Sequence, residues 1–145
     1  MSENGMFEKT KSFSIKRYWF DDIKLKSSFY RIGESLNIAF NVNSTCFLSQ
    51  SLVKIEMKFK SNCETCADAF CEVTCFCEFV FPNLKCKEDI PEFFYSNSIA
   101  IMFPYLRAFV SLVTMQANFG EPIVLPLLNL SAIGQTVKND MKVVE

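Results

Sequence analysis

The stretch Ser96–Phe119, SNSIAIMFPYLRAFVSLVTMQANF, decides the fold, because it predicts a long helix that is apolar on two nearly opposite sides. The wider apolar stripe consists of Ile99, Met102, Phe103, Leu106, Phe109, Val110, Val113 and Ala117. The second stripe consists of Ile101, Tyr105, Ala108, Leu112, Met115 and Phe119. A helix with two such stripes needs partner surface on both sides. We expect another subunit to cover the second side, with an oligomer interface at Ile101, Tyr105, Leu112 and Met115.

Two other interpretations of this stretch remain open. Its length would allow a membrane span, since roughly 20 residues cross a bilayer. Four of its residues disfavour that environment: Pro104, Arg107, Gln116 and Asn118. The core helix of a monomer is also compatible with the pattern. Of the three interpretations, we prefer a helix that is shared between subunits.

Four segments of alternating apolar and polar residues precede this helix and predict β-strands. They cover Ser12–Leu25, Leu36–Asn43, Val53–Lys60 and Phe70–Phe81. Their links are short and have no helical pattern, which predicts an antiparallel meander with one apolar face.

The first of these segments interrupts its own alternation. One parity contains Phe13, Ile15, Trp19, Ile23 and Leu25. Arg17 and Asp21 share that parity and break its apolar run, so we expect a bulge or twist near Trp19–Asp22. The fourth segment is more regular and places Cys71, Val73, Cys75, Cys77, Phe79 and Phe81 on one face.

Helical elements follow the strands. Pro104 predicts a kink or a break near Met102–Phe103, and Gly120 and Pro122 predict where the long helix ends. An apolar connection at Ile123–Leu130 leads to a short amphipathic helix at Leu130–Asn139, with one side formed by Leu130, Ile133 and Val137. The expected class is α+β, in a single domain over 1–145. A four-stranded antiparallel sheet occupies about 12–81, and a long helix and a short C-terminal helix occupy about 92–140.

Composition narrows the function classes. The net charge is −1, so no nucleic-acid-binding surface is indicated. Sixteen phenylalanines in 145 residues indicate either an unusually aromatic core or apolar surface used for binding. Met1–Lys11 is polar, and seven cysteines without a secretory signal fit a reducing cytoplasm, where we expect the protein to be found.

Candidate chemistry is sparse. The chain has no histidine, and its four glycines form no phosphate-binding loop. Cys63 and Cys66 form a CxxC pair, which leaves zinc or a redox site open, but the strand pattern offers no good second pair and no strand–helix context. The adjacent acidic pairs, Asp21–Asp22 and Glu88–Asp89, are typical of solvated turns or of opposite strand faces. We therefore expect no enzyme activity, no cofactor and no metal site.

The segment Met102–Gly134 resembles the SecB family of protein-export chaperones. The matching positions are Phe103, Pro104, Tyr105, Arg107, Phe119, Leu125, Pro126 and Asn129. Weaker similarity extends upstream to Ile15, Arg17, Asp22, Ile23 and Cys71–Val73. The resemblance implies a four-stranded antiparallel sheet followed by two helices, assembled as a dimer of dimers with the long helices between the sheets.

The resemblance also implies an activity, which is to hold unfolded polypeptides or preproteins, without ATP, in long apolar grooves. The corresponding peptide-binding positions are Phe29, Tyr30, Ile32, Leu36, Ile38, Phe40, Leu125, Leu127, Leu128, Ile133 and Val137. Exposed apolar side chains bind unfolded chains through buried area, which depends little on sequence. Any one of these residues could equally belong to the core.

Family members that deliver clients to the ATPase SecA use acidic residues on the solvent face of the sheet. Asp22 and Glu72 fall at such docking positions, but Lys26 stands where the family usually has Glu. A reversed charge opposes docking. Two alternatives to an export chaperone therefore stay open: a chaperone that serves a toxin–antitoxin pair, and a non-catalytic interaction or structural protein on the same fold.

Overall fold

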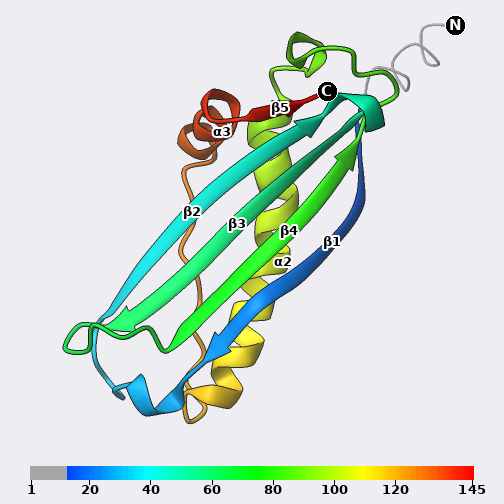
Figure 1. The fold of residues 1–145 in the computed structure, drawn as a ribbon. Helices are drawn as coiled ribbons and strands as arrows, with labels where there is room; N and C mark the ends of the chain where they lie inside the picture. The colour runs from blue at the N-terminus through cyan, green and yellow to red at the C-terminus, as the bar shows by residue number, and fades with distance from the viewer. Residues whose placement is uncertain (1–12) are drawn as a thin grey trace, which may run out of the picture.

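The computed structural model describes residues 13–145, so the predicted start of the first strand at Ser12 lies outside the described residues. A twisted five-stranded sheet has the order β1-β4-β3-β2-β5, and a long helix lies across one of its faces (Figure 1). The strands are β1 (Ser14–Leu25), β2 (Leu36–Phe47), β3 (Leu52–Cys63), β4 (Cys71–Val80) and β5 (Lys142–Val144), and the helices are α2 (Phe94–Ala117) and α3 (Leu130–Asn139). Short 3-10 turns occupy Ser27–Phe29, Leu48–Gln50 and Lys87–Asp89. The predicted α+β class is confirmed.

The core lies between α2 and the face of the sheet that α2 covers. From β3 and β4 it takes fully buried side chains at alternate positions: Val53, Ile55, Met57, Phe59, Val73, Cys75, Cys77 and Phe79. From α2 it takes Ile99, Met102, Leu106 and Val110, which are also fully buried. The wider stripe predicted for this helix is therefore the one that packs on the sheet. By length and hydropathy α2 could also span a membrane, but it is a partly buried core helix here.

The predicted four-strand meander is wrong for the first strand. β2, β3 and β4 do form consecutive antiparallel pairs, but β1 pairs with β4, on the far side of the sheet from β2. The connection between β1 and β2, residues 26–35, therefore crosses from one side of the sheet to the other (Figure 1). The apolar β4 sequence suits a central strand, and the charged β1 sequence suits an edge. The short strand β5, parallel to β2, has no counterpart in the sequence-based prediction.

The predicted common face of β1 is also wrong, because the strand has two register shifts. One lies between Ile15 and Arg17, and the other lies between Asp21 and Lys24, which agrees with the bulge expected near Trp19–Asp22. The first shift inverts the parity. As a result, Trp19 stacks on Phe76 on the open face of the sheet, with ring centroids 5.2 Å apart. Tyr18 and Phe20 face α2 instead, where they stack on Tyr105 and Phe109 at 4.0 and 4.1 Å.

Helix α2 continues through Pro104, so the predicted break does not occur. Proline removes the hydrogen bond to the carbonyl of Ala100, but Ala100 is exposed and water can satisfy that carbonyl. Burial of Met102, Phe103 and Leu106 on either side of Pro104 favours an unbroken helix. The helix ends as predicted before Gly120, whose N–H donates to the carbonyl of Met115 at 3.1 Å.

Residues 121–129, here called the strap, run from the end of α2 back along the sheet to α3 (Figure 1). The buried hydroxyl of Thr114 accepts the N–H of Ile123 at 2.7 Å, and the Ser111 hydroxyl donates to the Ile123 carbonyl at 2.8 Å. At the other end, the side chain of Asn129 caps α3 by accepting the N–H of Ala132. These bonds hold an extended segment that has no strand partner.

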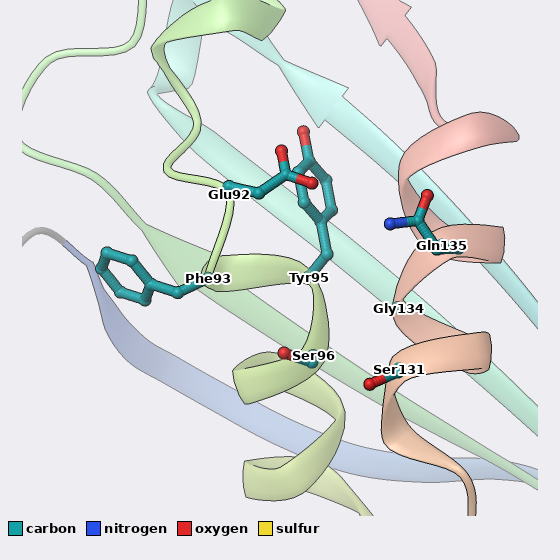
Figure 2. Close-up of a pocket in the computed structure, with 7 residues that line it drawn as sticks. All are labelled: Glu92, Phe93, Tyr95, Ser96, Ser131, Gly134 and Gln135. Atoms are coloured by element: carbon teal, nitrogen blue, oxygen red, sulfur yellow. The ribbon is translucent and has the colours of Figure 1, made fainter.

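Helices α2 and α3 approach closely at Gly134, which faces Ser96 (Figure 2). A Cβ on Gly134 would lie 3.0 Å from the backbone nitrogen of Ser96 and 3.1 Å from the carbonyl carbon of Tyr95. Backbone atoms cannot rotate away, so only glycine fits without displacing a helix.

Substitution Gly134→Ala is therefore expected to destabilise the protein. The clash costs about 1–3 kcal/mol, which exceeds the roughly 0.5–1 kcal/mol that alanine gains as a better helix former. Urea unfolding of the variant should show the lower free energy of unfolding. Gln135→Ala, at the exposed neighbouring position, is the matched control and should not destabilise. A Gly134→Ala protein as stable as the original would contradict the packing described here.

Candidate functional site: an apolar groove beside strand β2

Strand β2 carries a row of apolar side chains on the face that α2 covers, and they are only half-buried. Leu36, Ile38, Phe40 and Val42 form this row. The β3 side chains paired with them are fully buried, for example Phe59 opposite Phe40 and Met57 opposite Val42. The difference arises because β2 lies at the edge of the sheet over most of its length, beyond the cover of α2. An apolar margin is therefore left accessible along β2.

A cavity of about 170 Å³ lies between β2, the strap and α3. Its apolar walls come from Phe40, Val42, Met57, Leu128 and Ile133. Helix α3 is held beside β2 by a hydrogen bond in which the Ser44 hydroxyl donates to the Val137 carbonyl at 2.9 Å. The structure thus brings together three residues, Phe40, Leu128 and Ile133, that were predicted from distant parts of the sequence.

The outward side of the strap continues the apolar surface. Leu127 is 90% exposed and Val124 is 62% exposed. A second cavity, of about 570 Å³, lies between them and α2, with Phe103, Pro104, Arg107, Ala108 and Ser111 as its helix wall. Val124 was not among the predicted site residues, although its place in the apolar run of the strap was a signal for it.

The crossover connection after β1 borders the other end of this surface. Ile32 is 62% exposed, while Phe29 and Tyr30 are half-buried. The Tyr30 hydroxyl donates to a carboxylate oxygen of Glu121 at 2.5 Å, which joins the connection to the start of the strap. Partial burial, and then the bond to Glu121, raise the pKa of Tyr30 to about 12, so this donor keeps its proton at neutral pH.

Two of the predicted peptide-binding residues lie in the core. Leu125 and Val137 are each 1% exposed, and they hold the strap and α3 against the sheet. The other nine residues lie at least partly at the surface of the connection, β2, the strap and α3: Phe29, Tyr30, Ile32, Leu36, Ile38, Phe40, Leu127, Leu128 and Ile133. We call the surface formed by these nine residues the β2 groove.

The predicted docking residues lie at the other side of the sheet. Asp22 sits in the second β1 bulge with a positive φ of 51°. Glu72 pairs across the ladder with Lys24 on β1 and with Lys60 on β3. The same two lysines and Lys26 line a cavity of about 540 Å³ next to Glu72. Asp68 lines the same cavity, so three lysines stand beside two carboxylates, and this mixed charge disfavours a purely acidic docking surface.

The second stripe of α2 faces away from the sheet. Leu112 is 58% exposed and Met115 is 43% exposed, whereas Tyr105 is partly covered by Tyr18 and Ile101 is half-buried. These are the four residues predicted for the oligomer interface. In the single chain they leave apolar helix surface in contact with solvent, which is unfavourable without a partner.

The cysteines belong mainly to the core. Cys71, Cys75 and Cys77 are fully buried on the covered face of β4. Cys63 is buried at the end of β3, where its sulfur accepts the N–H of Arg31 at 3.1 Å, and Cys66 is half-buried in the following turn. Between residues 13 and 145, no group of three or more His, Cys, Asp or Glu residues is placed to hold a metal ion.

Comparison with solved structures identifies the architecture. The Rv1957 SecB-like chaperone of Mycobacterium tuberculosis, solved with a ChAD peptide from the HigA1 antitoxin, superposes with a TM-score of 0.65. The match covers 85% of this chain and 92% of that chain, at 12% sequence identity. The chain has a SecB-like fold.

Sequence comparisons add little to this result. No family model matches the chain. An uncharacterized protein of Methanocaldococcus jannaschii is 39% identical over 46 residues, which span 32% of this chain and 29% of that protein. The SecB-like assignment therefore rests on the three-dimensional arrangement.

Thiol reactivity should follow the burial of the cysteines. Burial raises the pKa of the thiols of Cys71, Cys75 and Cys77 to about 12, from an ordinary value of 9.0. At pH 8 these thiols stay protonated and inaccessible, so a maleimide should label the exposed Cys86 first. Peptide mass mapping at increasing times checks the order, and denaturant provides the fully labelled control. Rapid labelling of Cys75 in the folded protein would contradict the structure.

Proposed function

We propose that this protein is an ATP-independent chaperone that holds non-native polypeptides in the β2 groove. The observation that carries the proposal is the accessible apolar surface that runs from the crossover connection, along β2 and the strap, to α3. Such a surface suits clients that share exposed apolar side chains and have no common sequence.

The groove can bind by many shallow contacts. Full burial of one Leu or Ile side chain contributes about 1.5–3 kcal/mol, and the groove residues are already partly buried, so each contributes less than that. Several such contacts along one client, repeated in several subunits, add up to tight holding through effective concentration. A tetramer built as a dimer of dimers, with α2 helices packed between sheets, would cover the second stripe of α2 and align grooves of neighbouring subunits.

A second candidate is a chaperone dedicated to a segment of one partner. Its support is that the SecB-like chaperone with the same fold was solved with an antitoxin peptide. The lysines around Glu72 also favour a partner other than SecA. A general holdase binds several unrelated unfolded proteins, whereas a dedicated chaperone binds none of them.

The double substitution Ile32→Gln and Leu127→Gln should weaken client binding about tenfold or more. Both side chains are highly exposed, so the fold should tolerate the change, and together they remove about 1.5–3 kcal/mol of apolar contact. Titration with reduced, carboxymethylated proteins measures the affinity, and light scattering of a denaturing client measures holding.

The matched control for this experiment is Ile15→Gln. Ile15 is 37% exposed on β1, outside the β2 groove, and its substitution should leave client affinity unchanged. Equal affinity of the groove variant and the original protein would rule out the groove as the binding site. Failure of the original protein to bind any of several unfolded clients would rule out the general holdase in favour of the dedicated chaperone.

Charge on the second stripe of α2 should reduce the number of subunits. Leu112→Glu combined with Met115→Glu would bury carboxylates in the proposed interface, which is strongly unfavourable. Native mass spectrometry should show a tetramer for the original protein and smaller species for the variant. Gln135→Glu, at an exposed position on α3 and outside the second stripe of α2, controls for added charge. A single-chain mass for the original protein would refute the assembly.

A further inference from the structure

The turn after β3 contains the two cysteines of the CxxC pair, and their backbones lie close together. Cys66 donates its N–H to the Cys63 carbonyl at 3.1 Å, which closes a four-residue turn over residues 63–66. The end Cα atoms of such a turn lie less than about 7 Å apart, and a disulfide spans about 4.4–6.8 Å. Both side chains also belong to one apolar cluster, in which Cys63 is fully buried and Cys66 partly buried. The turn therefore meets the backbone requirement for a disulfide.

Neighbouring side chains hold this turn in shape. The Asn62 amide nitrogen donates to the Cys63 and Cys66 carbonyls, both at 3.0 Å, so it clamps the two ends of the turn. In the middle of the turn, Thr65 donates its N–H and its hydroxyl to the Glu34 carboxylate at 3.0 and 2.7 Å. A turn that is already fixed loses little conformational entropy when its ends are joined, which favours the intramolecular disulfide.

The two thiols differ in their access to solvent and in what they contact. Cys66 is half-buried, whereas Cys63 is fully buried. The Cys63 sulfur accepts the N–H of Arg31 at 3.1 Å, and its S–H donates to the Arg31 carbonyl at 3.8 Å. Arg31 belongs to the crossover connection, between the groove residues Tyr30 and Ile32. The reduced Cys63 thiol thus holds the middle of that connection against the end of β3.

Both ends of the crossover connection are held by backbone bonds that involve no sulfur. Lys26 donates its N–H to the Phe70 carbonyl at 2.8 Å, and the Ser35 carbonyl accepts the N–H of Glu64 at 3.0 Å. A disulfide leaves these bonds in place. It removes the S–H proton of Cys63, however, and turns the sulfur toward its new partner, so the middle of the connection loses its two bonds to the thiol. The expected loosening is therefore local.

We propose that Cys63 and Cys66 form a reversible disulfide, and that its formation releases the crossover connection at Arg31, at one end of the β2 groove. The disulfide itself does not depend on the proposed holding function. A change in client binding on oxidation is a consequence that does rest on that function.

The oxidant is a low-molecular-weight disulfide such as oxidised glutathione. The more accessible Cys66, as its thiolate, attacks one sulfur of that disulfide and expels the first glutathione thiolate, which takes up a proton from water. Cys63 then loses its proton to water and attacks the Cys66 sulfur of the mixed disulfide, which expels the second glutathione. Two protein thiols are thereby oxidised to one disulfide, and one glutathione disulfide is reduced to two thiols. An excess of reduced glutathione reverses both steps.

Disulfide formation can be tested on the full chain with Cys86→Ser, which removes the exposed thiol as a competing site. After equilibration with oxidised and reduced glutathione, blocking of free thiols and peptide mass mapping should show a Cys63–Cys66 linkage, lighter by two hydrogen atoms. Excess reduced glutathione should restore both thiols. A linkage of Cys63 to Cys71 instead, a mixed disulfide at Cys66 that does not resolve, or no oxidation of the folded protein would each overturn the inference.

Release of the crossover connection can be measured by amide hydrogen exchange, which needs no client. In the Cys86→Ser protein, oxidation should accelerate exchange at Arg31 at least threefold, because its N–H loses the sulfur acceptor. Adding Cys66→Ser keeps the Cys63 thiol and its bonds but prevents the disulfide, so exchange in this control should not respond to glutathione. Equal exchange of the oxidised and reduced protein at Arg31 would show that the connection is not released, and the inference would be wrong.

Client affinity separates this inference from the holding function. Where carboxymethylated proteins bind the reduced chain, oxidation should change their affinity at least threefold, and an unchanged affinity would overturn the effect on the groove. Absence of binding in both redox states would refute the general holdase, while the mass map and the exchange rates would still decide the disulfide.

Discussion

The packing of the inner stripe of α2 against β3 and β4 is the interaction on which the remaining structure depends. Ile99, Met102 and Leu106 are fully buried against the alternate side chains of the sheet, and each contributes about 1.5–3 kcal/mol of apolar burial. This contact fixes the rotation of α2 about its axis, so its second stripe must face outward. It also fixes where α2 ends, far from β5, so the chain must return along the sheet before α3 can form (Figure 1).

The strap carries the chain back along the sheet from α2 to α3, and the way it is anchored creates the groove. An extended segment without a strand partner must satisfy its backbone groups by other means. Thr114 and Ser111 do this for Ile123, and burial of Leu125 holds the middle of the strap. The intervening positions then point outward, which leaves Leu127 among the most exposed apolar residues of the described chain. The apolar surface of the groove thus follows from how the strap is anchored.

Much of this fold could be predicted because α2, α3 and the β2–β4 strands have strong local periodicity. The partner of β1 could not, since pairing with β4 depends on competition between edges and not on the β1 sequence alone. A bulge between Ile15 and Arg17 then reversed the parity of Trp19. For the site, the resemblance located the strap and α3, but an extended apolar segment does not reveal which residues face inward. Leu125 and Val137 were therefore grouped with residues that are accessible.

The two long strands at the margins of the sheet differ in sequence and register. An unprotected edge promotes aggregation, and natural proteins commonly blunt it with bulges, charges or proline. Here β1 has two register shifts and several charged residues, while β2 has an unbroken register with β3 and no charged residue beside an apolar cavity. Three asparagines on the open face of β2 limit its apolar surface to the groove side. Among residues 13–145, β1 pairs only with β4 and β2 pairs with β5 only at Thr45–Phe47, so both strands present backbone groups that no strand in the described chain satisfies.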